Sequence, residues 1–300
     1  MWFYLALISA LILGIYDVFK KMSLNNNAVL PVLMISISTS AALFIPLLFL
    51  SQFKVLPSHH YLYIPPITLK EHFQIIIKSI IVLGSWIFSF FALKNLPITI
   101  VTPIRSSGPL WTLLGAIVIF SEQLNYIQWI GIIVTLLFFY LFSTTGKAEG
   151  IQFRSNKWVW FIIFATLWGA ASGLYDKYLL HRVNRLAVQC WFSIYQACLM
   201  VPIILLLWWP KRKSSTQFEF RWSIPLIGLS LVIADFIYFS AVSQDDALIS
   251  VISAIRRGGV IIAFAIGAIV FKEKNIVKKG IFLAGILIGI GLLIIGSQIK

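Results

Sequence analysis

Charged residues are scarce in this sequence: they make up 11% of its 300 residues, whereas soluble globular chains carry about 25%. Hydrophobic residues account for 60% of the chain. So little polar surface cannot cover a water-soluble globule, and the low hydrophobicity that keeps a chain disordered is absent too. The composition therefore predicts an integral, multi-pass protein of a lipid bilayer.

Acidic residues are especially few, since 10 Asp and Glu stand against 24 Lys and Arg, which gives a net charge of +14. In a soluble protein this excess would suggest a nucleic-acid partner. Here the basic residues fall mainly in short breaks between apolar runs, which is typical of the loop charges that set membrane topology. We therefore expect no nucleic-acid partner.

The sequence also lacks the patterns that metal, cofactor and nucleotide chemistry require. Its two cysteines, Cys190 and Cys198, would lie about 12 Å apart along a helix, which is too far for a disulfide. No spacing of His and Cys suits a zinc site, and no glycine-rich loop followed by Lys and Ser or Thr suits an ATPase. We expect neither a metal nor a cofactor, and no catalytic residue.

Long apolar runs dominate what is present, and each is close to the length of about 20 residues that a spanning helix needs. A short polar stretch at 144–150 divides the runs into two sets of five. The predicted fold is therefore all-α, with ten transmembrane helices and both termini on the same side. The predicted spans are 2–19, 28–50, 72–93, 97–119, 126–144, 157–179, 187–209, 222–243, 247–271 and 276–297.

The two halves of the chain repeat each other. Three short matches occur in the same order in both halves, and five spans per half force the second half to enter the membrane in the opposite orientation. We therefore predict two inverted five-helix repeats, at 1–145 and 157–300, with a binding site between them near the midplane, as in many secondary transporters. The matches are Gly14–Phe19 with Gly173–Tyr178, Arg105–Gly108 with Arg256–Gly259, and Phe120–Glu122 with Phe271–Glu273.

The fourth span of each half contains proline or glycine. Each of these spans ends in a three-residue pattern, an apolar residue, then any residue, then Glu, and the two glutamates are Glu122 and Glu273. In this pattern and in its ten spans the chain resembles the EamA-type branch of the drug/metabolite transporter (DMT) superfamily, although the family's step is usually Gly-Glu. The resemblance implies a secondary transporter that moves a small metabolite by alternating access, commonly as an exporter in the bacterial inner (plasma) membrane. It leaves the substrate and the oligomeric state open.

Charges inside predicted spans need a reason, because each costs about 2.5–3.5 kcal/mol on insertion scales. Arg105, Arg256 and Arg257 either face a central cavity and hold an anionic group, or pair with intramembrane acids and carbonyls. On a continuous helix, Arg256 and Arg257 could not both point into one cavity. Asp235 is the candidate partner for Arg256 or Arg105, and as a buried carboxyl it also leaves proton coupling open.

Three cations against one acid predict a site that prefers an anionic or zwitterionic metabolite. Helix breaks beside the arginines strengthen this prediction, because the N–H groups at the start of a broken helix also favour negative charge. Small residues at the same positions could instead serve only close helix packing. The predicted breaks are Pro103, Gly108, Pro109, Gly258 and Gly259.

Two further sets of residues are candidates for the cavity, each with an ordinary structural alternative. The repeated pairs Tyr16-Asp17 and Tyr175-Asp176 are either interfacial anchors near span ends or gates and proton-responsive groups. Trp86 and Trp168 either stack on a substrate ring or pack against other helices.

The alternative function is an intramembrane enzyme acting on a lipid-linked or sugar substrate. Such an enzyme needs acids and histidines clustered at one membrane edge. The acids here are scattered, and the repeat-matched Glu122 and Glu273 are predicted at opposite faces. We therefore expect a non-enzymatic protein. A channel would need a repeated polar lining, which the sequence lacks.

Overall fold

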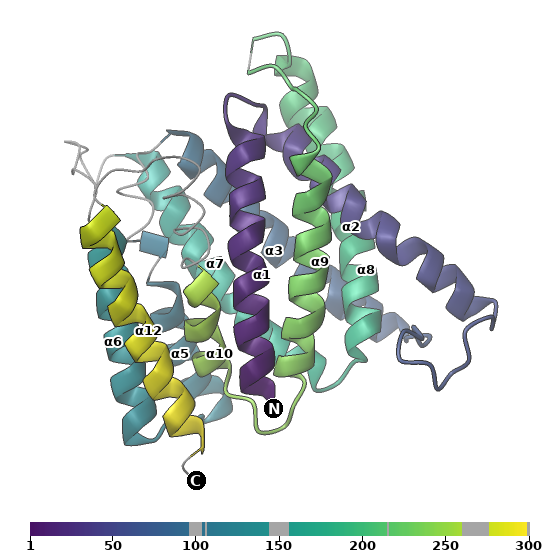
Figure 1. Cartoon of the computed structure of the whole chain (residues 1–300). Coiled ribbons are helices and arrows are strands. Elements are labelled where there is room, and N and C mark those ends of the chain that lie inside the picture. The colour runs from purple at the N-terminus through teal and green to yellow at the C-terminus, as the bar shows by residue number, and fades with distance from the viewer. Residues whose placement is uncertain (96–103, 106, 144–155, 215, 260–275, 299–300) are drawn as a thin grey trace.

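The computed structural model describes residues 1–95, 104–105, 107–143, 156–214, 216–259 and 276–298, and every regular element in these ranges is helical (Figure 1). Six of the helical stretches are long and apolar enough to cross a membrane. They are α1 (Trp2–Leu24), α2 (Val29–Gln52), α3 (Leu69–Asn95), α7 (Lys157–Leu180), α8 (Arg185–Ile203) with its continuation through η1 (Ile204–Trp208) and η2 (Trp209–Lys211), and α9 (Ser223–Val242).

Other helices occupy the positions of the remaining predicted spans. They are α5 (Gly108–Phe120), α6 (Tyr126–Ser143), α10 (Ile249–Arg256) with the 3-10 turn η3 (Arg257–Gly259), and α12 (Ile276–Gln298). Parts of the predicted fourth and ninth spans fall outside the described residues. An all-helical fold with six candidate spans is therefore shown, whereas the full count of ten stays a prediction.

Local sequence explains where several helices begin and end. The side chain of Asn156 accepts a hydrogen bond from the amide of Trp158 (2.9 Å) at the start of α7, and Asn184 caps α8 in the same way. Inside α8, Pro202 cannot donate a backbone hydrogen bond, and the helix passes at Ile204 into a wider π turn.

The main packing partners join one helix from before residue 144 to one from after residue 155. They are α1 with α9, α3 with α7, α2 with α8, α5 with both α7 and α10, and α6 with α12. We next replace each helix by the helix that holds the same position in the other half. The pair α1–α9 then becomes α7–α3, the pair α5–α7 becomes α10–α1, which are also in contact, and the pairs α2–α8, α5–α10 and α6–α12 are unchanged. The weaker contact of α2 with α9 likewise maps onto that of α8 with α3.

Contacts at the helix ends show in which direction the helices run. The indole of Trp2, at the start of α1, donates to Asp246 (3.2 Å), and Lys177, near the end of α7, donates to the carbonyl of Ala247 (2.9 Å). The first helix of each half therefore crosses the bundle in opposite directions. Asn125, just before α6, donates to the carbonyl of Gly296 near the end of α12 (2.6 Å), so these two helices are also antiparallel. The start of α1 and the end of α12 lie at the same end of the bundle (Figure 1).

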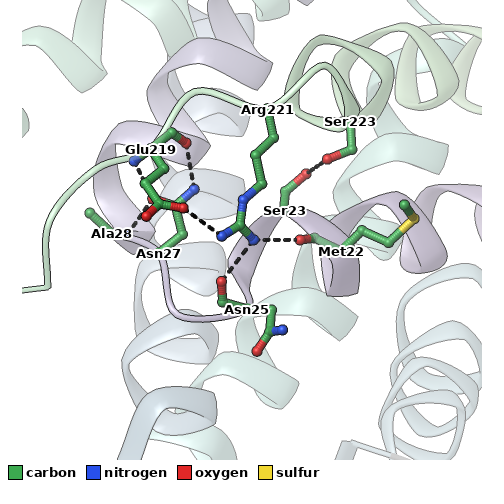
Figure 2. Close-up of polar contacts among 8 residues, drawn as sticks. All are labelled: Met22, Ser23, Asn25, Asn27, Ala28, Glu219, Arg221 and Ser223. Atoms are coloured by element: carbon green, nitrogen blue, oxygen red, sulfur yellow. Dashed lines mark hydrogen bonds and ion pairs between the residues drawn. The ribbon is translucent and has the colours of Figure 1, made fainter. Parts of the chain in front are cut away.

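At the other end, a polar cluster fastens the α1–α2 turn to the segment before α9 (Figure 2). Arg221 donates to the carbonyls of Met22 (2.9 Å) and Asn25 (2.8 Å) and to the carboxylate of Glu219 (2.8 Å). Asn27 exchanges two hydrogen bonds with the backbone of Glu219 (2.7 and 2.9 Å). The α1–α9 pair is thus joined by polar contacts at both of its ends.

Glycines let helix backbones approach closely, which is how helices associate in a bilayer without a hydrophobic driving force. A Cβ added at Gly228 of α9 would lie 2.2 Å from the carbonyl oxygen of Ser36 in α2. One added at Gly259 would lie 2.4 Å from the carbonyl oxygen of Ala10 in α1. At Gly259 the small residue therefore serves close packing.

We expect Gly228→Ala to lower the free energy of unfolding by about 1–3 kcal/mol, because the methyl group forces α2 and α9 apart. Gly291→Ala is the matched control, since nothing lies within 4 Å of the added Cβ. In a helix interior that substitution should be neutral or stabilising, by about 0.5–1 kcal/mol. Reversible unfolding of both variants in detergent measures the difference. Equal stability of the two variants would contradict this account of the packing.

Candidate functional site

A cavity of about 280 Å³ lies inside the bundle, with walls from α1, α3, α5, α7, α8, α9, α10 and η3. Helices from both halves of the chain therefore form it. Its volume suits a small metabolite. In the described part of the chain its lining includes five cations and two acids, which are Lys20, Lys78, Arg105, Arg256, Arg257, Asp176 and Asp235.

Lys78 and Asp176 form the more deeply buried of two ion pairs in this lining. Lys78 comes from α3 and Asp176 from α7, and their side chains are 2% and 6% exposed. The ammonium group of Lys78 also lies 4.5 Å from the ring centre of Phe192 and 4.8 Å from that of Phe239. This pair is electrically neutral and joins α3 to α7 across one side of the cavity.

Arg256 and Asp235 form the second ion pair, with 3.0 Å between Nη2 and Oδ1. The guanidinium also covers the ring of Tyr238, 3.8 Å from its centre. Asp235 lies in α9 and Arg256 at the end of α10, so the pair joins these two helices. Of the two partners that the sequence offered for Asp235, the structure selects Arg256.

Lys20, Arg105 and Arg257 form no ion pair with any side chain in the described ranges. The ammonium group of Lys20 lies 4.5 Å from the ring centre of Phe90. Arg257 lies against the start of α5, where a Cβ added at Gly108 would be 2.8 Å from its Nη2. Arg105 is close enough to both of the other cations to repel them. The three charges thus gather in one part of the cavity.

The expectation that Arg256 and Arg257 could not share a cavity is wrong. It considered only the angle about the helix axis. The α-helix ends at Arg256 and Arg257 begins the 3-10 turn η3, in which successive residues are about 120° apart, so the change of helix type does not bring the two residues onto one face. A long arginine side chain can nevertheless reach a cavity from the flank of its helix. Both side chains reach the cavity.

The other predicted residues are divided between the cavity and its surroundings. Tyr16, Trp86 and Gly108 line it. Asp17 is exposed outside the lining but attracts Lys20 and Arg257.

Four further candidates lie outside the lining, and two lie outside the described residues. Trp168 packs against Gly84, and the hydroxyl of Tyr175 donates to the carbonyl of Gln74 (3.2 Å). Pro109 lies in the first turn of α5, and a Cβ added at Gly258 would touch Ile290. Pro103 and Glu273 are the two that are not described.

Glu122 lies away from the cavity, in a buried network at the end where α1 begins. Its carboxylate pairs with Lys177 of α7 (2.7 Å) and accepts hydrogen bonds from the amide of Ile249 (2.8 Å) and from both the amide and the hydroxyl of Ser250. These amides belong to the first turn of α10, where a carboxylate also complements the helix dipole. Glu122 therefore ties the end of α5 to α7 and α10.

The sequence profile of the EamA-like transporter family matches residues 1–144. This part of the chain belongs to that family, which is part of the DMT superfamily. A solved structure described only as "Crystal structure of protein" superposes on the chain with a TM-score of 0.71, covering 99% of this chain and 96% of that one at 14% identity. That likeness shows the fold alone. A search of curated proteins returns no match.

Sequence reasoning missed three cations of this EamA-like chain. Lys78 lies inside the predicted span 72–93, so the cost of an intramembrane charge could have pointed to it. Lys20 and Lys177 follow the repeated Tyr-Asp pairs and resemble interfacial anchors. Their contacts with Phe90 and Glu122 depend on tertiary packing, which no local signal reports. Among the described residues, no group of three His, Cys, Asp or Glu side chains could hold a metal ion.

Proposed function

We propose that this protein is a secondary transporter that exports a small anionic or zwitterionic metabolite across a bacterial inner membrane by alternating access. The observation that carries the proposal is the charged cavity at the centre of an apolar helical bundle. Charges are costly in a bilayer and usually mark a substrate pathway there. An EamA-like first half and walls drawn from both halves support the same reading.

The arrangement of the helices supports two inverted five-helix repeats, at 1–145 and 157–300, within a ten-span fold. The packing partners remain the same when the halves are exchanged, and α1 and α7 run in opposite directions. Inverted repeats provide two related conformations that open a central site to either side of the membrane. Alternating access follows from rocking one half against the other.

The balance of charge supports the preference for an anion. Among the described residues, five cations and two acids line the cavity, and the two acids are already paired with Lys78 and Arg256. A cationic substrate would meet net repulsion, whereas an anion would meet three unpaired cations. An organic cation is therefore the substrate class that this cavity disfavours most.

Uptake into proteoliposomes tests the transport proposal directly. Metabolite profiles of medium from cells with and without the protein nominate substrates, which are then labelled and offered to vesicles. A transporter gives saturable uptake and accelerated exchange with substrate on the far side, and an imposed pH gradient tests proton coupling. Chemical conversion of the substrate, or uptake that does not saturate, would contradict the proposal.

Arg105→Gln and Arg256→Gln should separate binding from folding. Arg105 has no acid partner in the described residues, so its loss should leave the protein level unchanged and weaken substrate binding by about 1–3 kcal/mol. Loss of Arg256 leaves the carboxylate of Asp235 unpaired inside the bundle and should lower the protein level. Transport and protein level are measured together. Normal anion transport by Arg105→Gln at normal protein level would count against a binding role.

A further inference from the structure

The cavity carries a specific amount of uncompensated charge. The Lys78–Asp176 and Arg256–Asp235 pairs are each neutral. Among the described residues of the lining, this leaves the three cations Lys20, Arg105 and Arg257, none of which has an acid partner there. An excess of three positive charges favours a substrate that carries more than one negative charge.

The placement of these charges favours a dianion that carries both charges on one group. Arg105 precedes α5 by three positions, and Arg257 contacts the start of the same helix at Gly108. Lys20 approaches from α1 and is close enough to Arg105 to be repelled by it. A phosphate monoester carries about 1.5–2 negative charges at pH 7 and three acceptor oxygens on one centre, and arginine binds such groups through paired N–H donors. A dicarboxylate would divide its charge between two places.

Hydroxyl groups in the same cavity indicate what the rest of the substrate carries. Ser85, Thr112 and Thr166 each donate their own proton to a backbone carbonyl, of Ala165 (2.8 Å), Gly108 (3.3 Å) and Ile162 (2.7 Å). Their oxygens therefore offer lone pairs, which accept hydrogen bonds from O–H or N–H groups. A hydroxylated carbon skeleton supplies such donors.

We propose that the central site binds a phosphate monoester of a small hydroxylated metabolite, with Lys20, Arg105 and Arg257 holding the phosphate. This inference rests on the proposed transport function, because it specifies the substrate class of the same cavity. It differs from a general anion preference in requiring two charges on one group, and it excludes a zwitterionic amino acid as the best ligand.

Binding to the full-length purified protein in detergent tests the inference separately from transport. The probes are glucose 6-phosphate, glucose 6-sulfate with a single negative charge, glucose, succinate and glutamate, with affinities measured by calorimetry. We expect glucose 6-phosphate to bind about tenfold or more tightly than each of the others, which corresponds to about 1.4 kcal/mol. Arg257→Gln should weaken that binding about 10- to 100-fold, since a hydrogen bond between charged groups is lost. Arg182→Gln, at an exposed residue outside the cavity lining, is the matched control and should not change it.

The outcomes separate this inference from the proposed function. Equal or tighter binding of the sulfate, succinate or glutamate overturns the phosphate proposal, and so does unchanged binding by a folded Arg257→Gln variant. Saturable transport of glutamate or succinate in vesicles would then leave the transport function standing. Tight binding of glucose 6-phosphate without saturable uptake or exchange would support the phosphate site and contradict the transport function.

Discussion

Replacing Glu122 with Gln should lower the free energy of unfolding by about 3–5 kcal/mol, among the largest effects that we expect in this protein. The substitution keeps the shape of the side chain but removes the charge that compensates Lys177, which is buried among α5, α7 and α10. It also replaces one acceptor oxygen with a donor that faces the amide of Ile249 or the groups of Ser250. Reversible unfolding in detergent measures the loss.

The matched control for this prediction is Glu219→Gln. Glu219 also pairs with a cation, Arg221 at 2.8 Å, but its side chain is 65% exposed. An exposed ion pair contributes only about 0–1 kcal/mol, so the control should be nearly as stable as the unmodified protein. If both variants lost the same stability, burial of the Glu122 network could not be the cause.

Lys78→Met should destabilise the protein by a similar amount, about 3–5 kcal/mol, because it leaves Asp176 buried without its counter-charge. The double variant Lys78→Met/Asp176→Asn should recover most of this loss, since it removes both charges together. Thermal unfolding of the single and double variants measures the recovery. The double variant also leaves the net charge of the cavity unchanged, so its preference for anions should persist. A double variant less stable than Lys78→Met would contradict the pairing.

The helices were largely predictable because the signal for a spanning helix is local. The apolar runs at 157–179 and 222–243 correspond closely to α7 (Lys157–Leu180) and α9 (Ser223–Val242). The change of helical type after Pro202 was missed, although the proline itself is visible in the sequence. The effect of Pro202 depends on how the turn that follows it provides hydrogen-bond donors for the backbone carbonyl groups that the proline leaves without a partner.

Charged residues of the site could be predicted from the sequence, because a charge inside a membrane span is energetically costly. That cost pointed to Arg105, Arg256 and Asp235, which line the cavity. It could not distinguish a paired arginine from an unpaired one, since the distance between Asp235 and Arg256 is set by how α9 and α10 both pack against α1. The binding of the first turn of α10 by Glu122 depends equally on tertiary packing.

The packing of helices from one half against helices from the other half has a consequence for the order in which the protein can assemble during synthesis. Each of the main helix pairs joins a helix before residue 144 to one after residue 155. While the ribosome is still synthesising α7, the helices α1, α2, α5 and α6 are already made and their main partners are not. The faces that contact the second half, and polar groups such as Glu122, therefore stay uncovered in the bilayer until the second half is made. A chain interrupted before α8 should consequently lack most of its main helix contacts and be less stable than the full chain.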